Sequence, residues 1–292
     1  MTKPTVESLI ERADALLARL ETVLPRQAAA TDWVASTAFR YRKRGAVSGM
    51  GVIEPVKHVA TIRLADLKEV DRQRDRLIAN TLQFVAGKPA NNVLLTGARG
   101  TGKSSLIKAC LNEFAPHGLR LIEVDKADLV DLTDIVDVIA ERPERFVIFC
   151  DDLSFDDGEP GYKALKSVLD GSVAQASDNV LIYATSNRRH LLPEYMKENL
   201  SYTHTEDGEV HPGEVIEEKI SLSERFGLWL SFYPFTQAEY LAIVAQWLHH
   251  FGENDAARLE AARPEALVWA LERGSRSGRV AYQFARDWCG RA

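Results

Sequence analysis

The sequence has little cysteine, no long apolar run and no surplus of basic residues. Its three cysteines, Cys110, Cys150 and Cys289, lie far apart and form no Cys-x-x-Cys pair, which excludes the usual patterns of zinc and dithiol redox sites. No apolar run approaches the roughly 18 residues that are needed to cross a bilayer. The chain starts Met1-Thr2-Lys3-Pro4 and soon becomes charged, so it shows no apolar signal core. We therefore expect a cytoplasmic protein with reduced thiols and no membrane partner.

The charge balance disfavours a protein that coats nucleic acid. The 292 residues include 36 basic and 42 acidic side chains, a net charge of −6, and 46% are hydrophobic, as in ordinary globular proteins. One short basic cluster, Arg40 to Arg44, leaves a local contact with nucleic acid as an alternative. No H-E-x-x-H or G-x-S-x-G pattern is present, so the sequence indicates neither a metalloprotease nor a serine hydrolase.

The first 60 residues differ in pattern from the rest of the chain. Apolar residues between Val6 and Leu20 share one helical stripe, and a charged helix is expected over 67–85. At about 150 residues per domain, the length suggests about two domains. We expect a helical N-terminal extension over residues 1–60, an α/β domain over 61–235 and a helical domain over 236–292. In the last of these, Pro264 is expected to begin a helix that ends at Gly274.

Short apolar runs alternate with helical patterns from residue 92 onward. Expected strands are 93–96, 119–124, 146–150, 180–184 and 228–232, and expected helices are 103–114, 132–140 and 162–169. The run 146–150 has no polar residue, which is typical of a strand that is covered on both faces. Strands separated by helices predict a mostly parallel sheet flanked by helices.

A phosphate-binding loop is predicted between the first of these strands and the first helix. Its eight residues match the pattern G-x-x-x-x-G-K-[ST]: Gly97, Ala98, Arg99, Gly100, Thr101, Gly102, Lys103 and Ser104. Glycines let such a loop curl until successive backbone N–H groups face a phosphate, and the following helix directs its positive end at the same anion. In this arrangement Lys103 reaches the β- and γ-phosphates, and the Ser104 hydroxyl binds Mg²⁺.

Polar residues that follow two other strands complete the predicted site. Asp151 and Asp152 come directly after the strand 146–150, so they are expected beside the phosphate loop at the carboxyl edge of the sheet. Asp151 is the predicted second anchor of Mg²⁺, and Asp152 the group that activates the attacking water. Asn187 follows the strand 180–184 and could hold that water, provided its strand lies between the other two. Its alternative role is to cap a helix.

These residues resemble the AAA+ P-loop ATPase superfamily over about residues 60–290. Beyond the phosphate loop, the acidic pair and Asn187, two further stretches carry the resemblance, Ser223-Glu224-Arg225-Phe226-Gly227 and Ser277-Gly278-Arg279. The full pattern is most similar to a bacterial subgroup labelled domain of unknown function 815. The resemblance implies a P-loop fold with a C-terminal helical lid, ATP and Mg²⁺ as ligands, and assembly into a homo-oligomer such as a ring.

The resemblance also assigns roles to residues outside the phosphate loop. Arg225 would reach the nucleotide of a neighbouring subunit. Arg279 would contact the γ-phosphate in its own subunit, and Arg276 is the alternative candidate for this contact. Ser105 would also belong to the nucleotide site. Arg225 and Arg279 could instead be surface charges. The superfamily packs the base upstream of the phosphate loop, where Ile62, Leu64 and Val70 lie, and a core role serves each equally well.

The expected function is Mg²⁺-dependent ATP hydrolysis that drives conformational work on a protein client. The superfamily usually has glutamate where this chain has Asp152, so a second hypothesis is an ATP-dependent switch or scaffold that hydrolyses slowly. A third is a DNA-associated ATPase similar to helicase or transposition loaders. The acidic stretch 194–218, with a hairpin turn at Asp207-Gly208, is interpreted as a solvated loop. A partner-docking loop or a metal site at His204 and His211 remain as alternatives.

Overall fold

The computed structural model describes most of the chain after residue 30. The described ranges are 30–43, 51–155, 159–171, 177–188 and 222–291, with short pieces at 6, 10, 12–16, 203–204 and 210–211. Most of the expected N-terminal helix and of the acidic stretch 194–218 lies outside them. Within that stretch, β7 (Thr203–His204) and β8 (Val210–His211) pair antiparallel on the two sides of the predicted turn, and Asp207-Gly208 themselves lie outside the described residues.

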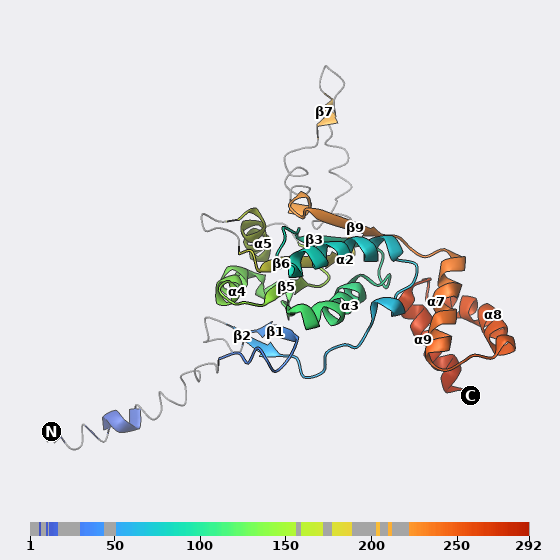
Figure 1. Cartoon of the computed structure of the whole chain (residues 1–292), viewed down its shortest axis with the longest axis horizontal. Coiled ribbons are helices and arrows are strands. Elements are labelled where there is room, and N and C mark those ends of the chain that lie inside the picture. Colours follow the sequence, from blue (N-terminus) through green and yellow to red (C-terminus); the bar gives the residue numbers. More distant parts are fainter. Residues whose placement is uncertain are drawn as a thin grey trace, which may run out of the picture.

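A seven-stranded sheet forms the centre of the molecule (Figure 1). Its order is β2-β1-β4-β5-β6-β3-β9, and every pairing except that of β1 with β2 is parallel. The strands are β1 (Ala38–Arg42), β2 (Val52–Pro55), β3 (Val93–Gly97), β4 (Leu119–Glu123), β5 (Arg145–Cys150), β6 (Val180–Ser186) and β9 (Leu228–Phe232). The expected mostly parallel sheet is confirmed, and β6 lies between β5 and β3 as the role of Asn187 required.

Helices cover both faces of the sheet. Alternate residues of β5 face opposite sides: Val147 and Phe149 pack in one core cluster and Phe146 and Ile148 in the other. The first cluster includes α2 (Asp71–Val85) and α3 (Lys103–Phe114), and the second includes α4 (Leu132–Ile139) and α5 (Pro160–Asp170). Because β5 is buried on both faces, it can consist almost entirely of apolar residues.

Three C-terminal helices, α7 (Gln237–His250), α8 (Ala256–Glu272) and α9 (Gly278–Gly290), form the expected helical lid. Figure 1 shows them gathered beyond one end of the sheet, away from α4 and α5. Pro264 lies inside α8 instead of beginning a helix, so that expectation is wrong. Asp255 caps α8 nine residues earlier by accepting from the N–H groups of Ala257 and Arg258. Pro264 has no N–H to donate to the carbonyl oxygen of Glu260. Because Glu260 is exposed, water can bond to this oxygen instead.

The N-terminal part of the chain contributes to the sheet, which corrects the expected helical extension. Residues 38–42 and 52–55, placed within that extension, form β1 and β2, and β1 pairs with β4. Phe39 is fully buried and Tyr41 nearly so, which shows that β1 belongs to the core. The sequence pattern did not reveal these strands because polar Arg40 and Arg42 alternate with the aromatic residues over only five positions.

Candidate nucleotide site

The phosphate loop links β3 to α3 as predicted. Gly97 has φ of +126°, and a Cβ at this position would lie 1.8 Å from the carbonyl oxygen of Phe232 on β9. The Ala98 N–H donates to that same oxygen at 3.2 Å. Only glycine fits here, because the loop begins against the backbone of the neighbouring strand. The Thr101 hydroxyl donates to the Ala98 carbonyl at 2.8 Å and holds the loop in its curled form.

Lys103 is buried under the loop and connects it to β6. Its ammonium donates to the carbonyl oxygens of Gly97 and Ala98, both at 2.8 Å, and to Asn187 Oδ1 at 3.1 Å. Burial lowers the pKa of this ammonium, Asp152 and Asp151 oppose that shift, and the positive charge of Arg99 adds to it. Bound phosphate would restore the charge balance around Lys103, since it brings negative charge to a partly desolvated cation.

Ser104 and Asp151 are in direct contact. The Ser104 hydroxyl donates to Asp151 Oδ1 at 2.6 Å, and the Thr185 hydroxyl donates to the same oxygen at 2.5 Å. A serine hydroxyl and a carboxylate held side by side are the oxygen donors that Mg²⁺ prefers, and they leave its remaining positions to water and phosphate. The pair therefore fits the metal that the fold family implies. Thr185 is a positioning residue that sequence reasoning missed, although it directly precedes Ser186 and Asn187.

Asp152 has an unusual backbone and a specific side-chain partner. Its φ is +53°, in the left-handed region that few non-glycine residues adopt, and its N–H donates to Thr185 Oγ1 at 2.9 Å. The Asn187 amide donates to the Asp152 carboxylate. Asn187 thus contacts Lys103 through its oxygen and Asp152 through its nitrogen. The structure therefore brings Lys103, Asp152 and Asn187 together, although they follow three different strands in the sequence.

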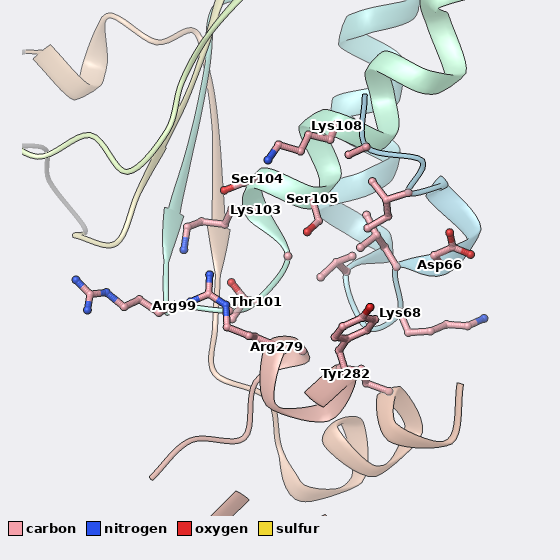
Figure 2. Close-up of a pocket in the computed structure, with 18 of the residues that line it drawn as sticks. Asp66, Lys68, Arg99, Thr101, Lys103, Ser104, Ser105, Lys108, Arg279 and Tyr282 are labelled. Atoms are coloured by element: carbon pink, nitrogen blue, oxygen red, sulfur yellow. The ribbon is translucent and has the colours of Figure 1, made fainter. Parts of the chain in front are cut away.

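A cavity of about 1100 Å³ lies between the phosphate loop and the lid. Of the predicted site residues, it is lined by Arg99, Gly100, Thr101, Gly102, Lys103, Ser104, Ser105, Asp151, Asp152, Asn187 and Arg279. Arg279 rises from α9 toward Thr101, and Ser105 projects from α3 (Figure 2). Arg276 and Leu64 are not among the lining residues, whereas Ile62 and Val70 are.

Away from the phosphate loop, the cavity is lined by aromatic and apolar side chains together with charged ones such as Asp66 and Lys68 (Figure 2). Trp247 and Tyr282 line it together with Ile62 and Val70, and their rings meet edge to face with centroids 5.0 Å apart. His250 also lines the cavity and packs against Trp247 at 5.3 Å. Figure 2 shows Tyr282 projecting from α9 toward the segment that carries Lys68. Sequence reasoning took the lid tryptophans for packing residues, because spacing along a helix cannot show which face meets another domain.

Arg225 lies apart from this cavity. Arg225 lies shortly before the first residue of β9. This strand begins at the edge of the sheet that is opposite to the edge carrying the phosphate loop. Its guanidinium forms an ion pair with Asp170, the last residue of α5. The backbone on either side is fixed, since Leu222 and Phe226 are buried. Arg225 is therefore remote from the nucleotide site of its own chain, and its role toward a second subunit stays a prediction.

The basic cluster near the N-terminus is partly neutralised. Arg40 forms an ion pair with Glu123 on β4, and Lys43 pairs with Asp131 at 2.8 Å. The Tyr41 hydroxyl also donates to Asp131, at 2.9 Å. Two of the cluster's cations thus face internal carboxylates, which weakens the alternative of a nucleic-acid contact here. Separately, none of the described helices combines the length and apolar character of a membrane span.

Comparisons with known proteins agree with this architecture. A family model described as protein of unknown function (DUF815) matches residues 34–292. A mutant RuvB structure from Thermotoga maritima aligns with a TM-score of 0.51 and 14% identity, covering 78% of this chain and 64% of that chain. The Thermotoga maritima RuvB structure described as a Holliday junction branch migration motor aligns with a TM-score of 0.47 and 16% identity, with the same coverage. No curated protein matches the chain.

The likeness to these solved structures is one of fold. The chain spans less than two thirds of their length, and identity is low. The sheet, the phosphate loop and the C-terminal helices together form the AAA+ P-loop architecture that the sequence predicted.

Proposed function

The chain belongs to the DUF815 family, and from this premise and the geometry of its nucleotide site we propose that it is a Mg²⁺-dependent ATPase. ATP hydrolysis in the cavity drives a conformational change that acts on a protein client. The observation that carries the proposal is the double contact of Asn187, which joins the phosphate-binding Lys103 to the acidic Asp152. A γ-phosphate and its attacking water belong between these two groups.

The proposal places the triphosphate on the phosphate loop and the base among the aromatic residues of the lid. Backbone N–H groups of residues 99–104 and the N-terminus of α3 bind the phosphates, with Lys103 at the β- and γ-phosphates. Arg279 approaches the same phosphates from α9. The base fits between Ile62 and Val70 on one side and Trp247 and Tyr282 on the other, all of which line the cavity.

The proposed hydrolysis uses the acidic pair in two ways. Ser104 and Asp151 hold Mg²⁺, which when bound neutralises charge on the phosphates. Asp152 accepts a proton from the attacking water, and Asn187 orients that water while it fixes the Asp152 carboxylate. Arg225 does not line the cavity and precedes the opposite end of β9, so we propose that Arg225 acts on the nucleotide of a neighbouring subunit in a homo-oligomer. Residues 61–235, together with β1 and β2 of the same sheet, then form the nucleotide domain, and 236–292 form the lid.

The test measures ATP turnover per subunit over a wide range of protein concentration. Wild type is compared with Lys103→Ala as the blank and with Arg225→Ala. We expect specific activity to rise with concentration and both substitutions to abolish it. Turnover that is insensitive to Lys103→Ala would refute the site, and turnover that is independent of concentration would refute the shared arrangement.

A second function, an ATP-dependent switch or scaffold, is favoured by one observation at Asp152. Its side chain is one methylene shorter than glutamate, and it is bound to Asn187 from a left-handed backbone. The switch hypothesis predicts that Asp152→Glu strongly accelerates hydrolysis while ATP affinity stays constant. If turnover of this variant does not increase, the natural carboxylate does not limit the rate.

An association with DNA is a weaker alternative, since Arg40 and Lys43 already face carboxylates. Filter binding over a salt series tests it, because phosphate contacts produce a steep dependence of affinity on salt. A flat salt dependence or absence of binding would leave the protein client as the proposed partner.

A further inference from the structure

The first residue of the lid helix α9 is hydrogen-bonded to the phosphate loop. The Gly278 N–H donates to the Gly100 carbonyl oxygen at 2.8 Å. The approach is close on both sides: a Cβ at Gly278 would lie 3.2 Å from that oxygen, and a Cβ at Gly100 would lie 2.8 Å from Ser277 Oγ. Gly100 also has φ of +73°. The contact therefore joins two backbones that only small residues allow to meet.

This hydrogen bond fixes the orientation of one peptide group in the loop. In a trans peptide the C=O and the following N–H point in opposite directions. Since the Gly100 carbonyl faces α9, the Thr101 N–H faces away from α9. Gly100, Thr101 and Gly278 all line the cavity. In an anion-binding nest, successive backbone N–H groups face the same anion, so the direction of this peptide decides whether the Thr101 N–H takes part.

We propose that Gly278 is a positioning residue for phosphate binding. Its N–H holds the peptide between Gly100 and Thr101, so that the Thr101 N–H is aimed at the β-phosphate before the nucleotide arrives. The lid thus helps to set the conformation of the phosphate loop, in addition to covering it. Arg279 follows Gly278 directly. The first turn of α9 therefore supplies a backbone donor to the phosphate loop and an arginine side chain to the cavity. This inference rests on the proposed nucleotide site.

The position of Gly278 permits a specific test. Ser277 is the N-cap of α9 and accepts from the Val280 N–H at 3.3 Å, so Gly278 is the first helical residue. Proline is well tolerated there by a helix but has no N–H, and its ring would occupy the path to the Gly100 oxygen. Gly278→Pro therefore removes the contact while α9 can still form. Gly278→Ala retains the N–H, and its Cβ at 3.2 Å from the Gly100 oxygen requires a shift of only a few tenths of an ångström, so it serves as the matched control.

The first readout is the affinity of the full-length protein for ADP and for AMP, by competition with a fluorescent ADP derivative. We expect Gly278→Pro to weaken ADP about three- to tenfold, the effect of one backbone hydrogen bond, and to leave AMP unchanged. AMP lacks the β-phosphate and so does not use the positioned N–H. Gly278→Ala is expected to stay within about twofold of wild type. An equal loss of affinity for ADP and AMP would mean that the lid only encloses the site, which contradicts the proposal. Unchanged ADP affinity in a folded Gly278→Pro protein would overturn it as well.

The second readout needs no nucleotide. Amide hydrogen exchange of residues 97–104 is measured in the ligand-free proteins. The proposal expects faster exchange in Gly278→Pro than in wild type or Gly278→Ala, because the loop loses its anchor on α9. Exchange that is the same in all three proteins would refute the anchoring. If ADP fails to bind even to wild type, the proposed function fails, and the exchange result still decides whether the lid orders the loop.

Discussion

The two ends of the nucleotide cavity are built on different principles. The phosphate end consists of one continuous loop, residues 97–104, together with polar residues that directly follow β5 and β6. The base end combines residues 60–70 with side chains of α7, about 180 residues later in the sequence, and of α9, more than 200 residues later. Hydrogen bonds with distinct partners define the first end, whereas the second end includes the ring contact of Trp247 with Tyr282 and apolar side chains beside charged ones.

This difference predicts different consequences of mutation. At the phosphate end each group has a specific electrostatic task, so a single substitution should remove function. At the base end several apolar groups share one task, and a single loss should be partly compensated. The four predictions below test this contrast, from the largest expected effect to the smallest.

Lys103→Ala should produce the largest effect. The ammonium is buried beneath the loop and holds two of its carbonyl groups, so its loss removes both the phosphate contact and the loop support. We expect ATP turnover to fall by at least about 100-fold, as for other preorganised charge-stabilising donors. Turnover is measured by phosphate release. Lys163→Ala, an exposed lysine on α5, is the matched control and should retain full activity.

Asn187→Ala should separate hydrolysis from binding. The substitution removes the amide that holds Asp152, so we expect the maximal rate to fall about 10- to 100-fold. ATP affinity should change less, because Lys103 keeps its bonds to the loop carbonyls. The measurement is kcat together with an independent Kd for ATP. A loss confined to Kd, with kcat unchanged, would contradict the proposed role.

Tyr282→Ala should weaken the base end moderately. Removing one ring from the aromatic wall is expected to weaken ATP about three- to tenfold, since a base–aromatic stack contributes about 1–3 kcal/mol and Trp247 remains. Discrimination between ATP and CTP should fall with it, because a smaller base loses less stacking. Titrations with both nucleotides measure this. Tyr233→Ala provides the control, since Tyr233 is 75% exposed and is not among the cavity residues.

The smallest energy change is expected for the stability of Asp152→Gly, and it should be stabilising. Glycine adopts the φ of +53° without the steric cost that a side chain imposes, so we expect the free energy of unfolding to rise by up to about 1 kcal/mol while hydrolysis is lost. Asp151→Gly is the control: this residue has no positive φ, and its carboxylate accepts from Ser104 and Thr185, so stability should fall. Urea denaturation compares both variants. A less stable Asp152→Gly protein would show that the Asn187 contact outweighs the backbone strain.

The sequence predicted those parts of the molecule in which local spacing determines geometry. The loop 97–104 and helix α3 follow from glycine positions, and the apolar runs of β3 to β6 identify a buried parallel sheet. The placement of Asp151, Asp152 and Asn187 followed from the rule that parallel strands present their carboxyl ends at one edge.

Other features depend on contacts between distant segments and leave no local signal. Trp247 on α7 and Tyr282 on α9 line the cavity only because these helices face residues 60–70. The spacing of residues within either helix does not indicate this. The ion pair of Arg225 with Asp170 joins two segments 55 residues apart. Thr185 is ordinary as a strand residue, and its role arises only because Asp151 and the Asp152 N–H lie opposite its hydroxyl.

The pairing of β1 with β4 also has a consequence for how the protein is made. Phe39 pairs with Ile122, so about 80 residues must be synthesised before β1 finds its parallel neighbour. At about 5–20 residues per second the ribosome needs several seconds for this stretch. During that time Phe39 and Ile53, both buried in the finished protein, have no sheet to pack against. β1 and β2 are therefore exposed to mispairing until β4 has been synthesised, and a chaperone that binds these two strands would protect them during that time.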